Sequence, residues 1–199
     1  MIRLLFCYND KRSFKQSVTD YVGENMKKVC FVCLGNICRS PMAEFVMKDL
    51  VTSENLLIES RATSNWEHGN PIHHGTQGIF KKHHIAYDYQ KSSQQISYQD
   101  FRDFDVIIGM DTNNVADLKE MSRGRFDEKI FLFVDGGVPD PWFTGDFDAT
   151  YERIPEIIAH PDYIGHHPNG QSLEYIKRID GNVLVAVRLC DKLNVRTCL

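Results

Sequence analysis

This sequence lacks several features that would by themselves indicate a class of protein. It has no block of several consecutive lysines and arginines, and its formal net charge is -4, so we expect neither a nucleic acid nor an anionic membrane as the main partner. No apolar run approaches the roughly 20 residues that cross a bilayer, and no signal-peptide core is recognisable. The six cysteines of this 199-residue chain therefore indicate a reducing compartment rather than a disulfide framework. We expect a cytoplasmic protein.

Little in the sequence suggests a metal site or a cofactor. Eight histidines are present, but the adjacent pairs at 73–74, 83–84 and 166–167 would diverge on a helix or a strand. No H-x-x-x-H spacing and no pair of C-x-x-C motifs would bring metal ligands together. We therefore expect solvated histidines, no metal and no cofactor. The sequence leaves the oligomeric state open.

The most informative segment that is present is an eight-residue loop, which we call the phosphate-binding loop. It reads Cys33, Leu34, Gly35, Asn36, Ile37, Cys38, Arg39 and Ser40. An apolar run at 29–32, typical of a buried parallel strand, precedes it, and apolar residues at helical spacing follow over 41–51. Gly35 and Asn36 tolerate positive φ, so successive N–H groups of the loop can turn toward one anion at the start of that helix. The segment predicts a phosphate site.

Three residues of this loop have distinct chemical uses. A cysteine thiol becomes a useful nucleophile where N–H groups, a helix N-terminus and a guanidinium stabilise its thiolate, and Cys33 is predicted to have all three. The planar guanidinium of Arg39 can bind two phosphoryl oxygens at once. The hydroxyl of Ser40 can form a hydrogen bond with the sulfur. A buried strand-end cysteine with an unrelated arginine is the alternative interpretation of Cys-x5-Arg alone, and the flanking residues weigh against it.

A nucleophile of this kind also needs an acid to protonate the leaving oxygen. The candidate is Asp140, which stands between two prolines in a segment expected to be a loop. Trp142 and Phe143 follow and could form a wall beside an aromatic leaving group. Taken alone, the segment would be interpreted as an ordinary Asp-Pro turn.

With these two segments, CLGNICRS at 33–40 and DPWF at 140–143, the chain resembles the low-molecular-weight protein tyrosine phosphatases. The resemblance covers about 27–154 and includes residues 60–71 and 109–114. It implies that Cys33 is the nucleophile, Arg39 the phosphate clamp, and Asp140 the general acid and then the base.

The same resemblance assigns supporting residues. It implies that Asn36, Ser40 and Ser60 hold the loop, and that Trp66 is an aromatic residue beside the cleft. It also marks Cys38 as a second thiol that could form a protective disulfide with oxidised Cys33, which remains a hypothesis.

The order of the expected elements predicts the fold. Strands and helices alternate, with strands at 29–33, 56–60, 105–110 and 129–134 and helices at 41–51, 76–84 and 113–121. Right-handed crossovers then give a parallel sheet with helices on both faces and Cys33 at a strand carboxyl end, where such sheets bind ligands. The resemblance implies four strands, hence a single α/β domain with a flavodoxin-like doubly wound sheet.

The chain departs from the family pattern at both ends, so we divide it into an extension at 1–25, a phosphatase-like domain at 26–154 and a divergent tail at 155–199. The extension is interpreted either as a flexible addition or as the product of an upstream start codon. Pro155 is expected to end a helix at 147–154. The segments 173–179 and 183–193 are candidates to replace the missing part, without which a sheet face would be exposed. A frame-shifted end is the alternative.

Three functions remain open on the sequence. The leading one is metal-independent hydrolysis of phosphotyrosine and other aryl phosphates through a phosphocysteine, and the expected partner is a phosphotyrosine-containing protein or a small aryl phosphate. Phosphotyrosine is favoured because Ile37 is apolar, whereas the phosphoarginine-directed relatives carry threonine there. The second is a thiol-dependent arsenate reductase, although such relatives use further cysteines in mid-chain and none lies between Cys38 and Cys190. The third is a non-catalytic phosphate-binding module, if the altered tail disables the site.

Overall fold

A four-stranded parallel sheet forms the centre of the molecule. The computed structural model describes residues 27–50, 56–159, 176–179 and 182–185. Within these ranges the strands β1 (Lys27–Cys33), β2 (Leu56–Ala62), β3 (Val106–Gly109) and β4 (Ile130–Leu132) pair in the order β2-β1-β3-β4. Every neighbouring pair is parallel. The predicted α/β class, strand number and strand direction are confirmed.

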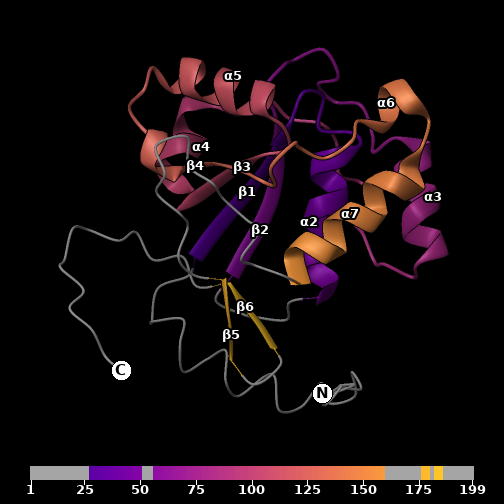
Figure 1. The fold of residues 1–199 in the computed structure, drawn as a ribbon. Helices are drawn as coiled ribbons and strands as arrows, with labels where there is room; N and C mark the ends of the chain where they lie inside the picture. The colour runs from indigo at the N-terminus through magenta and orange to yellow at the C-terminus, as the bar shows by residue number, and fades with distance from the viewer. Residues whose placement is uncertain (1–26, 51–55, 160–175, 180–181, 186–199) are drawn as a thin grey trace.

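Helices cover both faces of this sheet (Figure 1). On one face lie α2 (Arg39–Leu50), α3 (His74–Lys82) and α7 (Phe147–Ala159), and on the other lie α4 (Tyr98–Asp103) and α5 (Thr112–Ser122). The short α6 (Pro141–Thr144) precedes α7, and a 3-10 turn, η1 (Asp127–Lys129), precedes β4. The predicted doubly wound arrangement is therefore confirmed, while α4, α6 and η1 are elements that the sequence did not predict.

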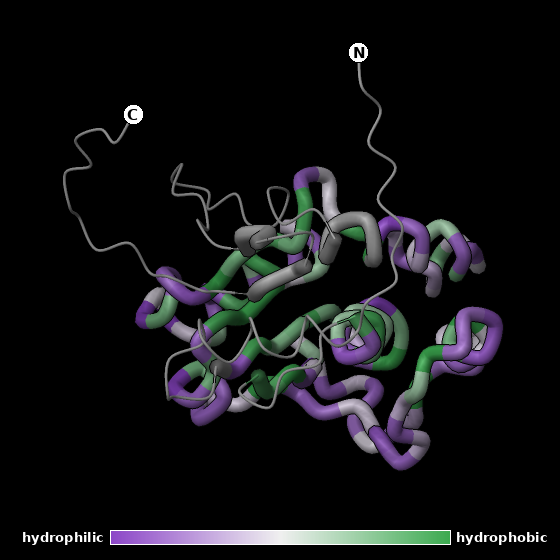
Figure 2. The backbone as a smooth tube through the Cα atoms, turned by 90° about the horizontal axis from the view of Figure 1, so that it is seen from below, coloured by the Kyte–Doolittle hydropathy of each residue, from purple (hydrophilic) through white to green (hydrophobic). Residues whose placement is uncertain are grey.

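The apolar run of β1 is explained by this layering. Side chains alternate along a strand, so Val29, Phe31 and Cys33 join the cluster that includes α2, α3 and α7, while Cys30 and Val32 join the cluster with α4 and α5. Figure 2 shows the apolar strands in the middle layer and hydrophilic residues at the outer turns. A strand buried on both faces has no polar side, which is why β1 shows no alternation in sequence.

The prediction that Pro155 ends a helix at residue 154 is wrong. The helix α7 continues through this proline to Ala159. Proline removes one N–H from the helical ladder at a cost of about 3 kcal/mol, but α7 is anchored to the core by the fully buried Ile154 and by Phe147 and Tyr151. Because α7, α2 and α3 cover this sheet face, no replacement helix is needed.

The two segments considered as replacements form something else where they are described. The strands β5 (Ile176–Ile179) and β6 (Asn182–Val185) pair antiparallel in a separate two-stranded sheet. The extension at 1–25, together with residues 160–175 and 186–199 of the tail, lies outside the described residues.

Candidate active site

The phosphate-binding loop connects the end of β1 to the start of α2, at the carboxyl edge of the sheet. Asn36 has a φ of 52°, which is the left-handed conformation expected there. Gly35 is not among the positive-φ residues, and its lack of a side chain has another reason: a Cβ at this position would lie 3.1 Å from Cγ of Glu67. The helix begins at Arg39 instead of Pro41, so Arg39 and Ser40 belong to its first turn.

The carbonyl oxygens of the loop are bound from its outer side. Ser93 Oγ donates to the Gly35 carbonyl at 2.8 Å, the His73 N–H donates to the Ile37 carbonyl at 2.9 Å, and Ser64 donates to that of Leu34. With the carbonyls held outward, N–H groups of the loop can face the space above Cys33. One of them, that of Asn36, donates to Cys33 Sγ at 3.3 Å.

Side chains brace the loop beneath the thiol. The amide nitrogen of Asn36 donates to Ser40 Oγ at 2.9 Å and to Ser60 Oγ at 2.8 Å. Ser40 Oγ lies 3.1 Å from Cys33 Sγ, and both side chains are buried. The structure thus brings together the three residues that the sequence selected as loop supports, and Ser60 comes from the neighbouring strand β2.

Arg39 lies between two carboxylates. Its Nη1 is 2.5 Å from Asp111 Oδ2, and its Nη2 is 2.5 Å from Asp140 Oδ2. Burial acts to lower the pKa of Arg39, but Cys33, Asp111 and Asp140 outweigh it, so that this pKa lies above its ordinary value. The guanidinium is therefore fixed, fully charged and directly connected to the candidate acid.

Asp140 occupies the N-terminus of α6, just outside a regular element as expected. Its Oδ1 accepts the N–H of Trp142 at 3.1 Å, and Pro141 takes the first helical position. The aromatic side chains predicted to line the cleft are exposed: Trp142 is 58% exposed, Phe143 79% and Trp66 77%. Exposed aromatic groups are available to contact a substrate.

Cys38 is buried at the base of this loop. Burial, and secondly the charge of Cys33, raise the pKa of the Cys38 thiol to about 12. At neutral pH Cys38 is therefore a neutral thiol.

Several site residues were missed by the sequence analysis. Asp111 lies in the 109–114 segment that supported the resemblance, but no role was attached to it. The sequence analysis also did not select Glu44 and Lys91, which contact Ser60. It did not select His73, which stacks on Phe147 and donates its N–H to the loop. Only these contacts distinguish the three from ordinary polar residues.

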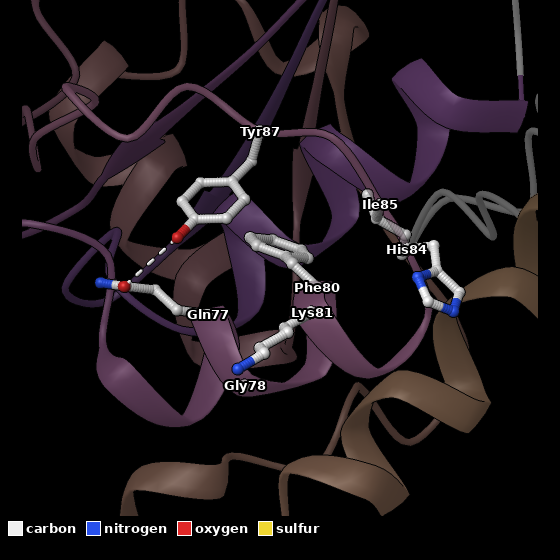
Figure 3. Close-up of a pocket in the computed structure, with 7 residues that line it drawn as sticks. All are labelled: Gln77, Gly78, Phe80, Lys81, His84, Ile85 and Tyr87. Atoms are coloured by element: carbon white, nitrogen blue, oxygen red, sulfur yellow. Dashed lines mark hydrogen bonds between the residues drawn. The ribbon is translucent and has the colours of Figure 1, made fainter.

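The part of the chain that the structure describes contains no group of three or more histidine, cysteine, aspartate or glutamate residues arranged to hold a metal. In these same ranges, no helix is long and apolar enough to cross a membrane. One further pocket lies beside α3 (Figure 3), and it is lined by Gln77, Gly78, Phe80, Lys81, His84, Ile85 and Tyr87. It shares no residue with the loop or with the Asp140 segment.

Comparison with known proteins identifies the family. The sequence model described as low molecular weight phosphotyrosine protein phosphatase matches residues 28–160. The chain belongs to this family. A curated relative, the low molecular weight protein-tyrosine-phosphatase YfkJ of Bacillus subtilis, is 40% identical over 140 residues, which are 65% of this chain and 89% of the relative.

Solved structures agree with this assignment. The low molecular weight protein tyrosine phosphatase of Streptococcus pyogenes is 64% identical with a TM-score of 0.66, and the match covers 66% of this chain and 88% of that one. The Drosophila arginine phosphatase is 34% identical with a TM-score of 0.59, covering 65% and 92%. The chain is therefore a protein-tyrosine-phosphatase of the low molecular weight class.

A second sequence model matches the C-terminal part of the chain. It is described as phage-Barnase-EndoU-ColicinE5/D-RelE like nuclease3, and it matches residues 139–198. This range begins at the Asp140 segment and includes β5 and β6. The tail is thus similar to a family other than the phosphatases.

Proposed function

We propose that this chain hydrolyses phosphotyrosine and other aryl phosphate monoesters through a phosphocysteine intermediate, without a metal ion. The observation that carries the proposal is the direct link between Arg39 and Asp140 beside the loop that holds Cys33. The nucleophile and the clamp come from one loop, and the acid comes from a segment much later in the chain that meets them at the same edge of the sheet.

The contacts suggest how the reaction proceeds. Thiolate sulfur of Cys33 attacks phosphorus, while Arg39 and the N–H groups of the loop bind the phosphoryl oxygens. Asp140 protonates the leaving phenol, then takes a proton from the water that hydrolyses the phosphocysteine. In this scheme phosphate replaces one carboxylate as a partner of Arg39, which frees Asp140 to act on the leaving oxygen.

Phosphotyrosine is the proposed substrate class. The exposed Trp66, Trp142 and Phe143 favour an aryl group, and Ile37, although buried, makes the loop apolar at that position. Phosphoarginine is the second candidate, because the Drosophila relative is named an arginine phosphatase. An arsenate reductase is less well supported, since the free cysteines within the described ranges are Cys30, Cys33 and Cys38.

Phosphate release from p-nitrophenyl phosphate tests the proposal. The assay compares the full chain with Cys33→Ser at mildly acidic pH, with a chelator present. We expect turnover in the parent alone and a trapped phosphocysteine after rapid acid quench. Turnover that is present without the chelator and lost with it would contradict the metal-independent mechanism. No turnover in the parent, with phosphate still bound, would favour the non-catalytic module.

Reversible oxidation is a further part of the proposal. Peroxide would convert Cys33 to a sulfenic acid, and attack by the Cys38 sulfur would release water and form the disulfide. The raised pKa of Cys38 means that this attack needs local opening of the loop. We expect thiol reductants to restore activity in the parent and to restore less in Cys38→Ser.

A cytoplasmic location and the division at residues 25 and 154 also remain proposals. Limited proteolysis followed by mass spectrometry checks the division. Cleavage confined to residues 1–26 and to residues beyond 159 would move the second boundary to the end of α7.

A further inference from the structure

Glu44 is a buried carboxylate behind the phosphate-binding loop. It lies on α2 and is only 2% exposed. Its Oε2 is 3.0 Å from Lys91 Nζ, and the Lys91 side chain is itself only 13% exposed. Its Oε1 is 2.5 Å from Lys48 Nζ, on the solvent side of the same helix. Burying a charge this deeply costs free energy unless the charge is paired. The position of Glu44 therefore calls for a functional explanation.

The same carboxylate is in contact with the residues that brace the loop. Ser60 Oγ lies 2.6 Å from Glu44 Oε2. An ionised carboxylate only accepts hydrogen bonds, so the single proton of Ser60 must point to Glu44. Ser60 Oγ then accepts the bond from the Asn36 amide nitrogen at 2.8 Å.

The hydrogen bonds continue from Asn36 to the sulfur of Cys33. Asn36 Oδ1 accepts the Gln94 N–H at 3.2 Å, so the amide nitrogen of Asn36 faces the two serines. Its second proton is donated to Ser40 Oγ at 2.9 Å, so Ser40 accepts there and must donate its own proton elsewhere. Cys33 Sγ lies 3.1 Å away and the Arg61 carbonyl 3.2 Å away. When Cys33 is a thiolate, the sulfur is the stronger acceptor.

We propose that Glu44, paired with Lys91, is a positioning residue that orients the proton of Ser60 and, together with the Gln94 N–H, holds the Asn36 amide so that Ser40 donates to the Cys33 thiolate. Glu44 touches neither the substrate nor the sulfur. It acts through three intervening side chains, and all of them are fully or nearly fully buried. The inference rests on the proposed thiolate chemistry of Cys33.

The test separates this role from a merely structural one. It measures the alkylation rate of Cys33 by neutral iodoacetamide at mildly acidic pH, by mass spectrometry, together with kcat and the inhibition constant of inorganic phosphate. The matched variants are Glu44→Gln, which keeps the shape, and Lys48→Met, which removes the solvent-side partner only.

For Glu44→Gln we expect alkylation and kcat to fall by about 10-fold to 100-fold, the range given by one hydrogen bond to a charged group. The phosphate inhibition constant should change by less than about 3-fold, because Arg39 and the loop N–H groups bind phosphate without Glu44. Lys48→Met should leave all three quantities within about 2-fold, since the Lys48 amine is largely solvated and Lys91 still pairs with Glu44.

A double-mutant cycle with Ser40→Ala completes the test. If Glu44 acts through Ser40, adding Glu44→Gln to Ser40→Ala should cause no further loss of alkylation rate. Additive losses would overturn the proposal, and so would a phosphate inhibition constant that rises together with the loss of reactivity, because both indicate general collapse of the loop.

A second variant addresses stability. Glu44→Met combined with Lys91→Met replaces the buried pair with apolar groups of similar size, which often preserves folding. Recovery of the parent's alkylation rate in this folded variant would overturn the positioning role. If the parent lacks turnover altogether, the proposed function fails, but alkylation still decides the role of Glu44.

Discussion

Replacing Asp140 by asparagine tests the assignment of the general acid most directly. The change removes the proton donor and one of the two anionic partners of Arg39, whose other partner, Asp111, remains. Asparagine keeps an oxygen that can accept the Trp142 N–H, now bound at 3.1 Å, so the start of α6 should be preserved. The variant therefore separates loss of the acid from loss of the loop geometry.

The expected effect depends on the leaving group. General acid catalysis contributes about 10²-fold to 10⁴-fold, which is roughly 3 to 5 kcal/mol of activation free energy. A phenol as basic as tyrosine, with a pKa of about 10, needs the proton most and should show the upper end of this loss. More acidic phenols leave without much help and should show a smaller loss.

The assay is kcat for a series of aryl phosphates whose phenols differ in acidity. Asp146→Asn is the matched control, because it makes the same change of charge at an exposed position. Asp146 likewise accepts a backbone N–H, that of Ala149 at 2.9 Å. It should leave kcat unchanged. An equal loss across the whole series in Asp140→Asn would refute general acid catalysis and indicate that Asp140 acts by holding Arg39.

Two further predictions concern stability. A Cβ at Gly109 would lie 2.8 Å from Cγ2 of Val115, so Gly109→Ala should lower the free energy of unfolding in urea by about 1–3 kcal/mol. Gly78 has open space around it in the middle of α3, so Gly78→Ala should raise this free energy by up to about 1 kcal/mol. Equal effects of the two substitutions would contradict the packing argument. Burial and the charge of His74 lower the pKa of His73, which accepts a hydrogen bond at the start of α3. The unfolded chain then takes up the proton more readily, so the free energy of unfolding should fall as pH drops below about 6.5. His73→Asn, which keeps a hydrogen-bond acceptor, should weaken this pH dependence. An unchanged pH profile in this variant would contradict the role of His73.

Local patterns were enough to predict the sheet and the loop. The strand at 29–33 and the helix after it were recognisable because burial on both faces of β1 and helical spacing in α2 leave short-range signatures. The special conformation of Asn36 was predicted for the same reason, since it depends on the residue itself.

Local rules failed where packing outweighs them. Pro155 is unfavourable inside a helix, yet α7 continues past it, and the burial of Ile154 against the core is invisible to a rule about single residues. The six-residue α4 was missed because its apolar contact is mainly the one buried side chain of Phe101, too short a pattern to recognise.

By itself, the sequence determined which residues could perform the chemistry: a cysteine and an arginine at fixed spacing before a helix, and an aspartate held in a proline-rich turn. Only the tertiary structure decided how they are connected. Arg39 reaches Asp111 and Asp140, and Asn36 reaches Ser60 and thereby Glu44, across contacts between residues far apart in the chain. The physical reason is that secondary structure and turns follow short-range preferences, whereas the partner of a buried charge is set by the order of the strands and the helices packed on them.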